Sequence, residues 1–428
     1  MPAYPQSVPI PPPRRALGVL IAGLALLLVS GCTTTAAQAA FRAFPHSPYA
    51  DIPTLLNQQA RALELGDEAG WLAPVDATQI AVVQRYRELF RSMRAAGVLN
   101  LVPIVNPADV AHIKPGTRLL VAVGYAFCVQ VADCPTTGLG GASQNTETIF
   151  TQVTFIERGE TVAISAFELT PIPISGLGRA PWIDNPNLEF LSGTRVTVIA
   201  SADMKNRMAS ALAAADAAAT VADRYAQWVW PVRYLVYLAN PSEWRAWIAG
   251  SPGSDGVVAY AAAPSTSSEV VVVNVALQDT NADPLVSVLR HEFGHVVTLL
   301  GVHRNDVMAP HLIVEGIADY IAEDGRPLSA YLPLSLVRQY VHSGRFNGDL
   351  DAVEDLFHSS NLRDVEIAYG LGMLTIRCIA DRYGKPKMLD FIERALRKRA
   401  NVDAAATAAL GEPWSAVRST CASYIRAV

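Results

Sequence analysis

Two stretches near the beginning of the chain carry apolar residues at the three- and four-residue spacing of an amphipathic helix. These are residues 53–65 and 80–96, and Gly97 is placed to end the second helix. Three extended stretches rich in Val, Ile, Phe and Thr follow, at residues 118–129, 148–155 and 162–169. Helices followed by antiparallel strands predict an α+β fold for this half of the chain.

Prolines and glycines between residues 171 and 186 break any regular element and mark a domain boundary. Beyond them, a long alanine-rich helix is predicted at residues 203–228. Extended runs lie at residues 194–200, 232–238, 256–262 and 269–275, and the last two predict a hairpin. Trp228 and Trp230 are expected to pack in the core. No repeat of fixed period is visible, which excludes solenoids and propellers.

The pattern of residues near the N-terminus predicts an export signal. Arg14 and Arg15 precede an apolar run at residues 16–29, which is shorter than the roughly 20 residues that cross a bilayer and matches a signal-peptide core. The small residues before Cys32 resemble a bacterial lipobox, which implies that Cys32 becomes the lipidated first residue of the mature protein. Residues 33–40 are typical of a tether. An ordinary secretory signal with a chance cysteine is the alternative.

Composition and charge indicate a globular protein and argue against a nucleic-acid-binding function. With 51% hydrophobic and 17% charged residues, the 428-residue chain is globular. Lys and Arg number 34 against 39 Asp and Glu, a formal charge of -5, so no nucleic-acid partner is expected.

Five cysteines are present, and lipidation of Cys32 would leave an even number in a compartment that permits disulfides. The local interpretation pairs Cys128 with Cys134 and Cys378 with Cys421, although three connectivities are formally open. A zinc cluster of these cysteines is disfavoured, because the sequence holds no Cys-x-x-Cys pair.

A His-Glu-Phe-Gly-His motif begins at His291, after an apolar run that Asp283 and Pro284 are suited to start as a helix. At a spacing of four residues, His291 and His295 project from one helix face and can both bind a single Zn²⁺ at about 2.0–2.1 Å. Glu292 then lies where it can take a proton from zinc-bound water, whose pKa the ion lowers to about 7. The motif indicates metallopeptidase chemistry.

Such a site needs a third ligand. The metzincin pattern would place a glycine and then a histidine three and six residues after His295, but Thr298 and Gly301 stand there. In the gluzincin pattern the third ligand is a glutamate on a second helix, and Glu315 stands twenty residues after His295 in such a stretch.

Asp319 stands one turn beyond Glu315 on the same predicted helix face. There it can accept a hydrogen bond from the outer nitrogen of a ligand histidine, with His291 the first candidate, and fix the tautomer of that ring. Gly294, inside the motif, is expected to keep the helix slim where it crosses neighbouring backbone.

The motif with Glu315 and Asp319 resembles the gluzincin (thermolysin-like) clan, more closely its peptidase MA-like branch of exported actinobacterial proteins. The resemblance covers about residues 194–428. It implies a mixed-sheet upper lobe, a zinc helix across the cleft floor and a helical lower lobe. It also implies an edge strand that aligns an extended peptide by main-chain hydrogen bonds, expected at residues 269–275.

A peptidase of this kind also needs a hydrogen-bond donor, expected from the lower lobe, that stabilises the oxyanion of the tetrahedral intermediate. Tyr369 is favoured because Gly370 allows its helix to approach closely, although core packing is an equal alternative. His342 and His358 are rivals for this role. His303 and His311, between the two ligand helices, are expected to have surface or supporting roles.

The first half resembles the cone-shaped NTF2-like fold in its order of helices and a curved sheet. That resemblance implies a packing or binding role, since no acid/base pair is visible there. The predicted boundaries are 1–31 for the signal peptide, 32–48 for the tether, 49–175 for the NTF2-like domain, 176–192 for a linker and 193–428 for the gluzincin-like domain.

The sequence therefore predicts an exported lipoprotein, anchored to the outer face of a bacterial cell membrane, that hydrolyses peptide bonds with Zn²⁺. Its expected partners are a peptide or protein substrate and, through the first domain, a further protein. The alternative is a catalytically silent zinc-fold module that binds peptides or proteins in the envelope.

Overall fold

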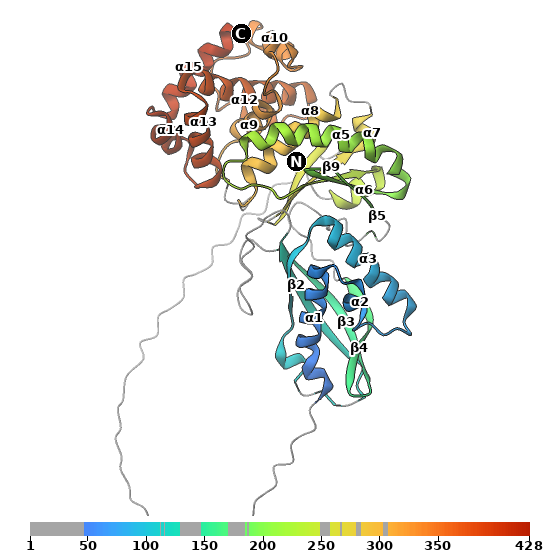
Figure 1. Ribbon diagram of the computed structural model, residues 1–428. Coiled ribbons are helices and arrows are strands. Elements are labelled where there is room, and N and C mark those ends of the chain that lie inside the picture. The colour runs from blue at the N-terminus through green and yellow to red at the C-terminus, as the bar shows by residue number, and fades with distance from the viewer. Residues whose placement is uncertain are drawn as a thin grey trace, which may run out of the picture. The chain divides into compact units, whose positions relative to one another are not determined.

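The computed structural model describes residues 47–111, 113–114, 116–128, 147–169, 185, 188–248, 257–265, 268–279, 284–302 and 307–428. In this part the chain forms helices and an antiparallel sheet, then a mixed sheet, then a helical C-terminal region (Figure 1). The predicted α+β class is confirmed. Cys32 and the rest of the expected export segment lie outside the described residues.

The N-terminal region begins with three helices, α1 (Ile52–Leu65), α2 (Glu68–Leu72) and α3 (Ile80–Ala96). Gly66 and Gly97 end α1 and α3 with φ of 74° and 75°, a left-handed conformation that glycine adopts without strain. Trp71 on α2 is buried, and its indole N–H donates to the Tyr86 carbonyl on α3 at 2.7 Å. This contact fixes the short helix against the long one.

An antiparallel sheet follows, with strands in the order β1-β2-β3-β4. The strands are β1 (Leu99–Ile104), β2 (Leu119–Cys128), β3 (Glu147–Arg158) and β4 (Thr161–Leu169). The sequence analysis missed β1, which contains Pro103 and a register shift between Leu99 and Val102. Proline is tolerated there because β1 lies at the sheet edge among the described strands.

The second sheet has the order β5-β6-β7-β9-β8. Its strands are β5 (Leu188–Ser192), β6 (Val196–Ser201), β7 (Tyr234–Ala239), β8 (Ala259–Ser265) and β9 (Ser268–Asn274). The three central strands are parallel, and β5 and β8 pair antiparallel at the two edges. Strand β5 falls within residues 176–192, the stretch expected to be a linker.

The expected position of the edge strand is wrong. Residues 269–275 were expected at the edge, but β9 lies between β7 and β8, and β8 is the edge among the described strands. The physical reason is burial. Strand β9 is covered on both faces, since its four consecutive valines, Val270 to Val273, are all buried. On β8, in contrast, the Tyr260 side chain is 38% exposed.

Helix α5 (Lys205–Ala222) connects the parallel strands β6 and β7 and continues into the 3-10 helix η4 (Asp223–Tyr225). It ends before the predicted residue 228. Trp228 packs partly buried against the core. The expectation for Trp230 is wrong, because its side chain is 55% exposed and the Arg195 guanidinium lies over its ring at 5.0 Å.

Three helices that follow this sheet along the chain carry or support the predicted site: α8 (Leu285–Leu299), α9 (His311–Ala322) and α12 (Leu362–Tyr383). They approach closely at glycines. A Cβ on Gly294 would lie 3.0 Å from the Ala318 Cα, and one on Gly316 would lie 2.6 Å from the Gly372 carbonyl carbon. Gly294 therefore has the structural role expected of it.

Of the remaining helices, those near the C-terminal end gather together, orange and red in Figure 1. The remaining helices are α6 (Pro241–Trp247), α7 (Val275–Gln278), α10 (Leu334–His342), α11 (Glu354–Phe357), α13 (Lys385–Ile392), α14 (Val402–Leu410) and α15 (Trp414–Ala427). Within the described ranges, none of the helices is long and apolar enough to cross a membrane.

Cys378 on α12 and Cys421 on α15 form a disulfide, the pairing expected from their helices. Cys128, at the end of β2, is also disulfide-bonded. Its expected partner, Cys134, lies outside the described residues.

Candidate metal centre

Helix α8 presents two different faces. Phe293, Val296 and Val297 are buried, and the Phe293 ring stacks on Tyr234 of β7 with centroids 4.3 Å apart. This packing turns His291 and His295 toward α9. Pro284 itself occupies the N-cap position. The expected cap, Asp283, lies outside the described residues.

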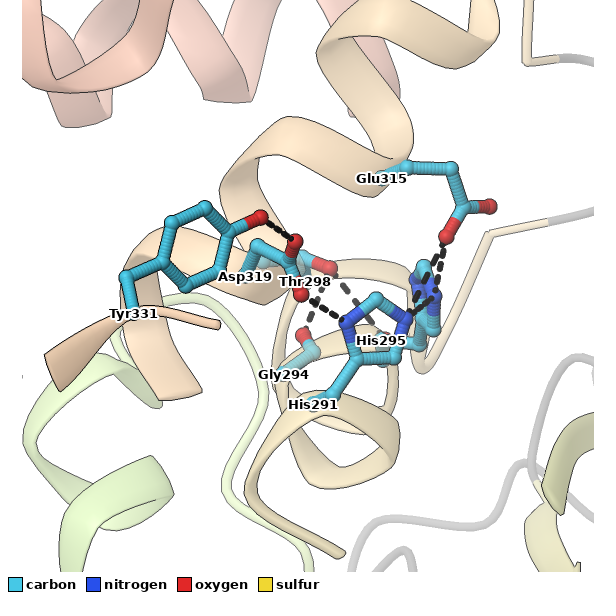
Figure 2. A network of polar contacts seen from close by, with 7 residues as sticks. All are labelled: His291, Gly294, His295, Thr298, Glu315, Asp319 and Tyr331. Atoms are coloured by element: carbon cyan, nitrogen blue, oxygen red, sulfur yellow. Dashed lines mark hydrogen bonds and ion pairs between the residues drawn. The ribbon is translucent and has the colours of Figure 1, made fainter. Parts of the chain in front are cut away.

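Helix α9 places Glu315 and Asp319 one turn apart, on the side that faces the two histidines (Figure 2). Its apolar residues are buried around them, among them Ile313 and Ile317. Because Gly294 lets α8 lie close to α9, short carboxylate side chains can reach the imidazoles.

The structure brings His291, His295 and Glu315 together, as the spacing predicts, and these three residues can hold a metal ion. The two Nε2 atoms lie 3.1 Å apart, and the Glu315 Oε2 atom lies 3.1 Å from His295 Nε2 and 3.3 Å from His291 Nε2. Tetrahedral ligands at 2.0–2.1 Å from one ion stand about 3.3–3.4 Å apart. The donor set therefore fits a small divalent metal with little adjustment.

Asp319 holds the ring of His291. The imidazole Nδ1 donates to Asp319 Oδ1 at 2.7 Å, which leaves Nε2 directed at the metal position. The other carboxylate oxygen of Asp319 accepts a hydrogen bond from the Tyr331 hydroxyl (Figure 2). The sequence analysis missed Tyr331, since it lies beyond the end of α9 and reaches the site only through the tertiary fold.

His295 has no equivalent support among the described residues. Its Nδ1 atom is buried and has no hydrogen-bond partner there. Thr298, one turn further on, instead donates its hydroxyl to the carbonyls of Gly294 and His295, at 2.8 and 3.2 Å. The threonine therefore stabilises the backbone of α8 around the motif.

The ionisable side chains of the centre shift one another's pKa values. Burial opposes the charged form of His291, but the hydrogen bond and charge of Asp319, followed by Glu315, raise the pKa of His291 well above its usual value. Burial also opposes ionisation of Glu315, yet the charges and hydrogen bonds of His295 and His291 lower the pKa of Glu315 well below its usual value. Glu315 is thus an ionised ligand at neutral pH.

Glu292 is buried beside the two histidines and makes no contribution to the group of three ligands. Burial raises its pKa, the charges of His291 and His295 oppose the rise, and the charge of Glu315 adds to it. The backbone N–H of Ala261 on β8 hydrogen-bonds the carboxylate. Glu292 therefore lies between the metal position and the edge strand, and the pKa of its carboxyl group is raised above the usual value.

Tyr369 on α12 lies against the centre, its ring centroid 5.7 Å from that of His291. The charge of Glu315, then burial, raises the pKa of Tyr369 well above its usual value, so the phenol stays a hydrogen-bond donor at neutral pH. Of its rivals, His342 is exposed at the end of α10 and His358 contacts Glu354. His303 lies outside the described residues.

No protein-family model matches this chain, and no curated protein matches it. The described part of the chain carries a His-x-x-x-His motif on one helix and a downstream glutamate on the next, arranged as a metal site.

Proposed function

We propose that the protein is a zinc-dependent hydrolase of peptide bonds. The observation that carries the proposal is the convergence of two histidine Nε2 atoms and one glutamate oxygen within 3.3 Å of one another. A buried glutamate that is not part of this triad lies next to it. This is the ligand and base arrangement of the gluzincins that the sequence resembles.

The donor set favours zinc. Two imidazole nitrogens with one carboxylate, and room for a fourth ligand, are typical of catalytic zinc sites, whereas Ca²⁺ and Mg²⁺ prefer oxygen donors. A zinc ion held by His291, His295 and Glu315 would supply Lewis acidity, lowering the pKa of water and polarising a substrate carbonyl.

The protein's own residues would handle the proton and the developing charge. Glu292, with its raised pKa, is suited to accept the proton from the attacking water and return it to the leaving amide nitrogen. Tyr369, protonated and adjacent, is suited to donate a hydrogen bond to the oxyanion.

Strand β8 is suited to align an extended peptide. It lies at the sheet edge among the described strands, and Ala261 links it to Glu292. Pairing of a substrate main chain with this edge would place a peptide carbonyl near the centre and tolerate many side chains. We therefore infer that the substrate is an extended segment of peptide or protein.

Cys32 and the apolar run before it support the further proposal that the protein is exported and lipid-anchored at the outer face of a bacterial membrane. In that location the N-terminal region would recruit a protein partner. A catalytically silent module that binds peptides along β8 is the second candidate, favoured by the position of β8 at the sheet edge among the described strands.

The substitution Glu292→Gln tests the proposed mechanism. We expect metal content to be unchanged and hydrolysis of a peptide library, followed by mass spectrometry, to fall by at least about 10²-fold, because the base is removed. Glu366→Gln, on an exposed part of α12, is the matched control and should keep full activity. Hydrolysis retained by Glu292→Gln would overturn the mechanism, and a metal-loaded wild type that binds but cuts no peptide would support the silent module.

A further inference from the structure

A second group of possible metal ligands lies outside the candidate metal centre. It consists of His311, Glu354 and His358, whose ligand atoms all lie within 4.8 Å of one another. His311 is the first residue of α9, Glu354 the first of α11, and His358 follows α11 directly. We call these three residues the surface triad.

The surface triad is already connected by polar contacts. The His311 Nδ1 atom is hydrogen-bonded to Glu354 Oε1, and the His311 backbone N–H donates to Glu354 Oε2 at 3.0 Å. His358 Nε2 lies 3.6 Å from the same Oε1 atom. The rings of His311 and His358 are perpendicular, with centroids 5.4 Å apart. Three possible ligand atoms from two segments of the chain therefore lie close together.

The spacing and chemistry match a metal site. Glu354 and His358 are four residues apart around one helical turn, the same spacing that lets His291 and His295 share an ion. Two imidazoles and a carboxylate are donors that zinc prefers. The 3.6 Å between His358 Nε2 and Glu354 Oε1 is close to the distance of about 3.3–3.4 Å expected between two ligand atoms in tetrahedral coordination. Exposed side chains can make the remaining adjustment.

Two features make this site weaker than the buried one. The side chains of His311, Glu354 and His358 are 52%, 32% and 66% exposed, against 15%, 9% and 15% for His291, His295 and Glu315. In addition, the N-terminus of α9 carries partial positive charge, which disfavours a cation. The Glu354 carboxylate offsets that charge without abolishing it.

We propose that the surface triad is a second, exchangeable Zn²⁺ site. The proposal does not rest on the proposed hydrolase activity. An ion held there joins the start of α9 to α11, and α9 also carries Glu315 one turn after His311. The Phe357 ring lies 5.7 Å from His311 and 5.4 Å from Tyr369, so the ion would also stabilise the packing behind the candidate metal centre.

Zinc titration of the full-length protein by equilibrium dialysis tests this site. We expect the wild type to bind two equivalents, one retained against a competing chelator and one removed by it. His358→Ala should lose the exchangeable equivalent and keep the retained one. His358 is preferred to Glu354 for substitution, because the Glu354 carboxylate also accepts the first backbone N–H of α9. His342→Ala, an exposed histidine on α10, is the matched control and should bind two.

Glu315→Ala separates this site from the candidate metal centre. That variant should lose the retained equivalent and keep the exchangeable one. A wild type that binds no second equivalent, or a His358→Ala variant that still binds two, would overturn the second site. A wild type that lacks the retained equivalent but binds the His358-dependent one would count against the proposed hydrolase and leave the surface triad supported.

Discussion

At the scale of single residues, the centre depends on a chain of hydrogen bonds that runs from Tyr331 through Asp319 to His291. The carboxylate fixes which ring nitrogen of His291 carries the proton, and the phenol fixes the carboxylate. Because the His291 and Asp319 side chains are only 15% and 14% exposed, water cannot readily replace either contact. Asp319 is thus a positioning residue for a ligand.

Replacing Asp319 tests this role. We expect Asp319→Ala to weaken zinc binding by about 10–100-fold, the usual effect of losing a carboxylate behind a ligand histidine, and Tyr331→Phe to have a smaller effect in the same direction. Competition with a chromophoric chelator measures both. Asp203→Ala, at an exposed carboxylate, is the control. Wild-type affinity in Asp319→Ala would show that the hydrogen bond does not position His291.

The raised pKa of His291 predicts how zinc binding depends on pH. In the metal-free protein the ring keeps its proton to a pH above the ordinary histidine value of about 6.5, so below that raised pKa the ion must displace a proton. Affinity should therefore fall, as pH decreases, from a point above pH 6.5. Glu315, whose pKa is lowered, stays ionised and adds no proton in this range.

Binding constants measured across the pH range, with proton release by calorimetry in two buffers, test this dependence. In Asp319→Asn the main cause of the raised pKa is removed, so the fall should begin at lower pH. Affinity that stays constant down to well below pH 6.5 in the wild type would contradict the account.

The two histidine ligands could be predicted from sequence because their relation is local, whereas Glu315 was predicted only through its match to the gluzincin pattern. Four residues within one helix fix the relative direction of His291 and His295, whatever the rest of the fold does. Glu315 and Asp319 are likewise related by one helical turn. Tyr331 has no such relation to Asp319, because its position depends on the turn after α9 and on packing against neighbouring helices.

At the scale of elements, the site depends on how closely three helices approach. Gly294 allows contact between α8 and α9, and Gly316 and Gly372 allow contact between α9 and α12. Any side chain at these contacts would separate the helices and move Glu315 away from the histidines. The glycines thus belong to the site even though they carry no chemistry.

Gly316→Ala tests this packing. The added Cβ would lie 2.6 Å from the backbone carbon and oxygen of Gly372, which cannot move aside as a flexible side chain can. We expect the free energy of unfolding to fall by about 1–3 kcal/mol and zinc affinity to fall with it. Urea unfolding and zinc titration of the same variant measure both. A variant with unchanged stability and affinity would show that α9 and α12 can separate without disturbing the centre.

The sequence predicted helices better than sheet topology. The bounds of α3 agree with the stretch at 80–96, because apolar period and a terminal glycine are local signals. The hairpin of β8 and β9 was also expected, but its pattern does not say which arm pairs with β7. Which arm of the hairpin lies at the sheet edge is decided by tertiary packing. The sequence analysis missed β1 because Pro103 and the register shift interrupt its strand pattern.

At the scale of the whole molecule, the described chain places a mixed sheet before the ligand helices and a set of helices after them. The sheet supplies the edge strand beside Glu292, and the C-terminal helices supply Tyr369. The Cys378–Cys421 disulfide joins two of those helices, α12 and α15. The α+β class followed from the order of elements, whereas the meeting of α8, α9 and α12 at one centre needed the structure.

Metal content of the purified protein tests the central claim most directly. After dialysis against a mild chelator, we expect mass spectrometry to find about one zinc ion per wild-type chain, none in Glu315→Ala, and about one in the control Glu366→Gln. Folding of each variant is checked by circular dichroism. A well-folded wild type that stays free of metal when offered zinc would contradict the account.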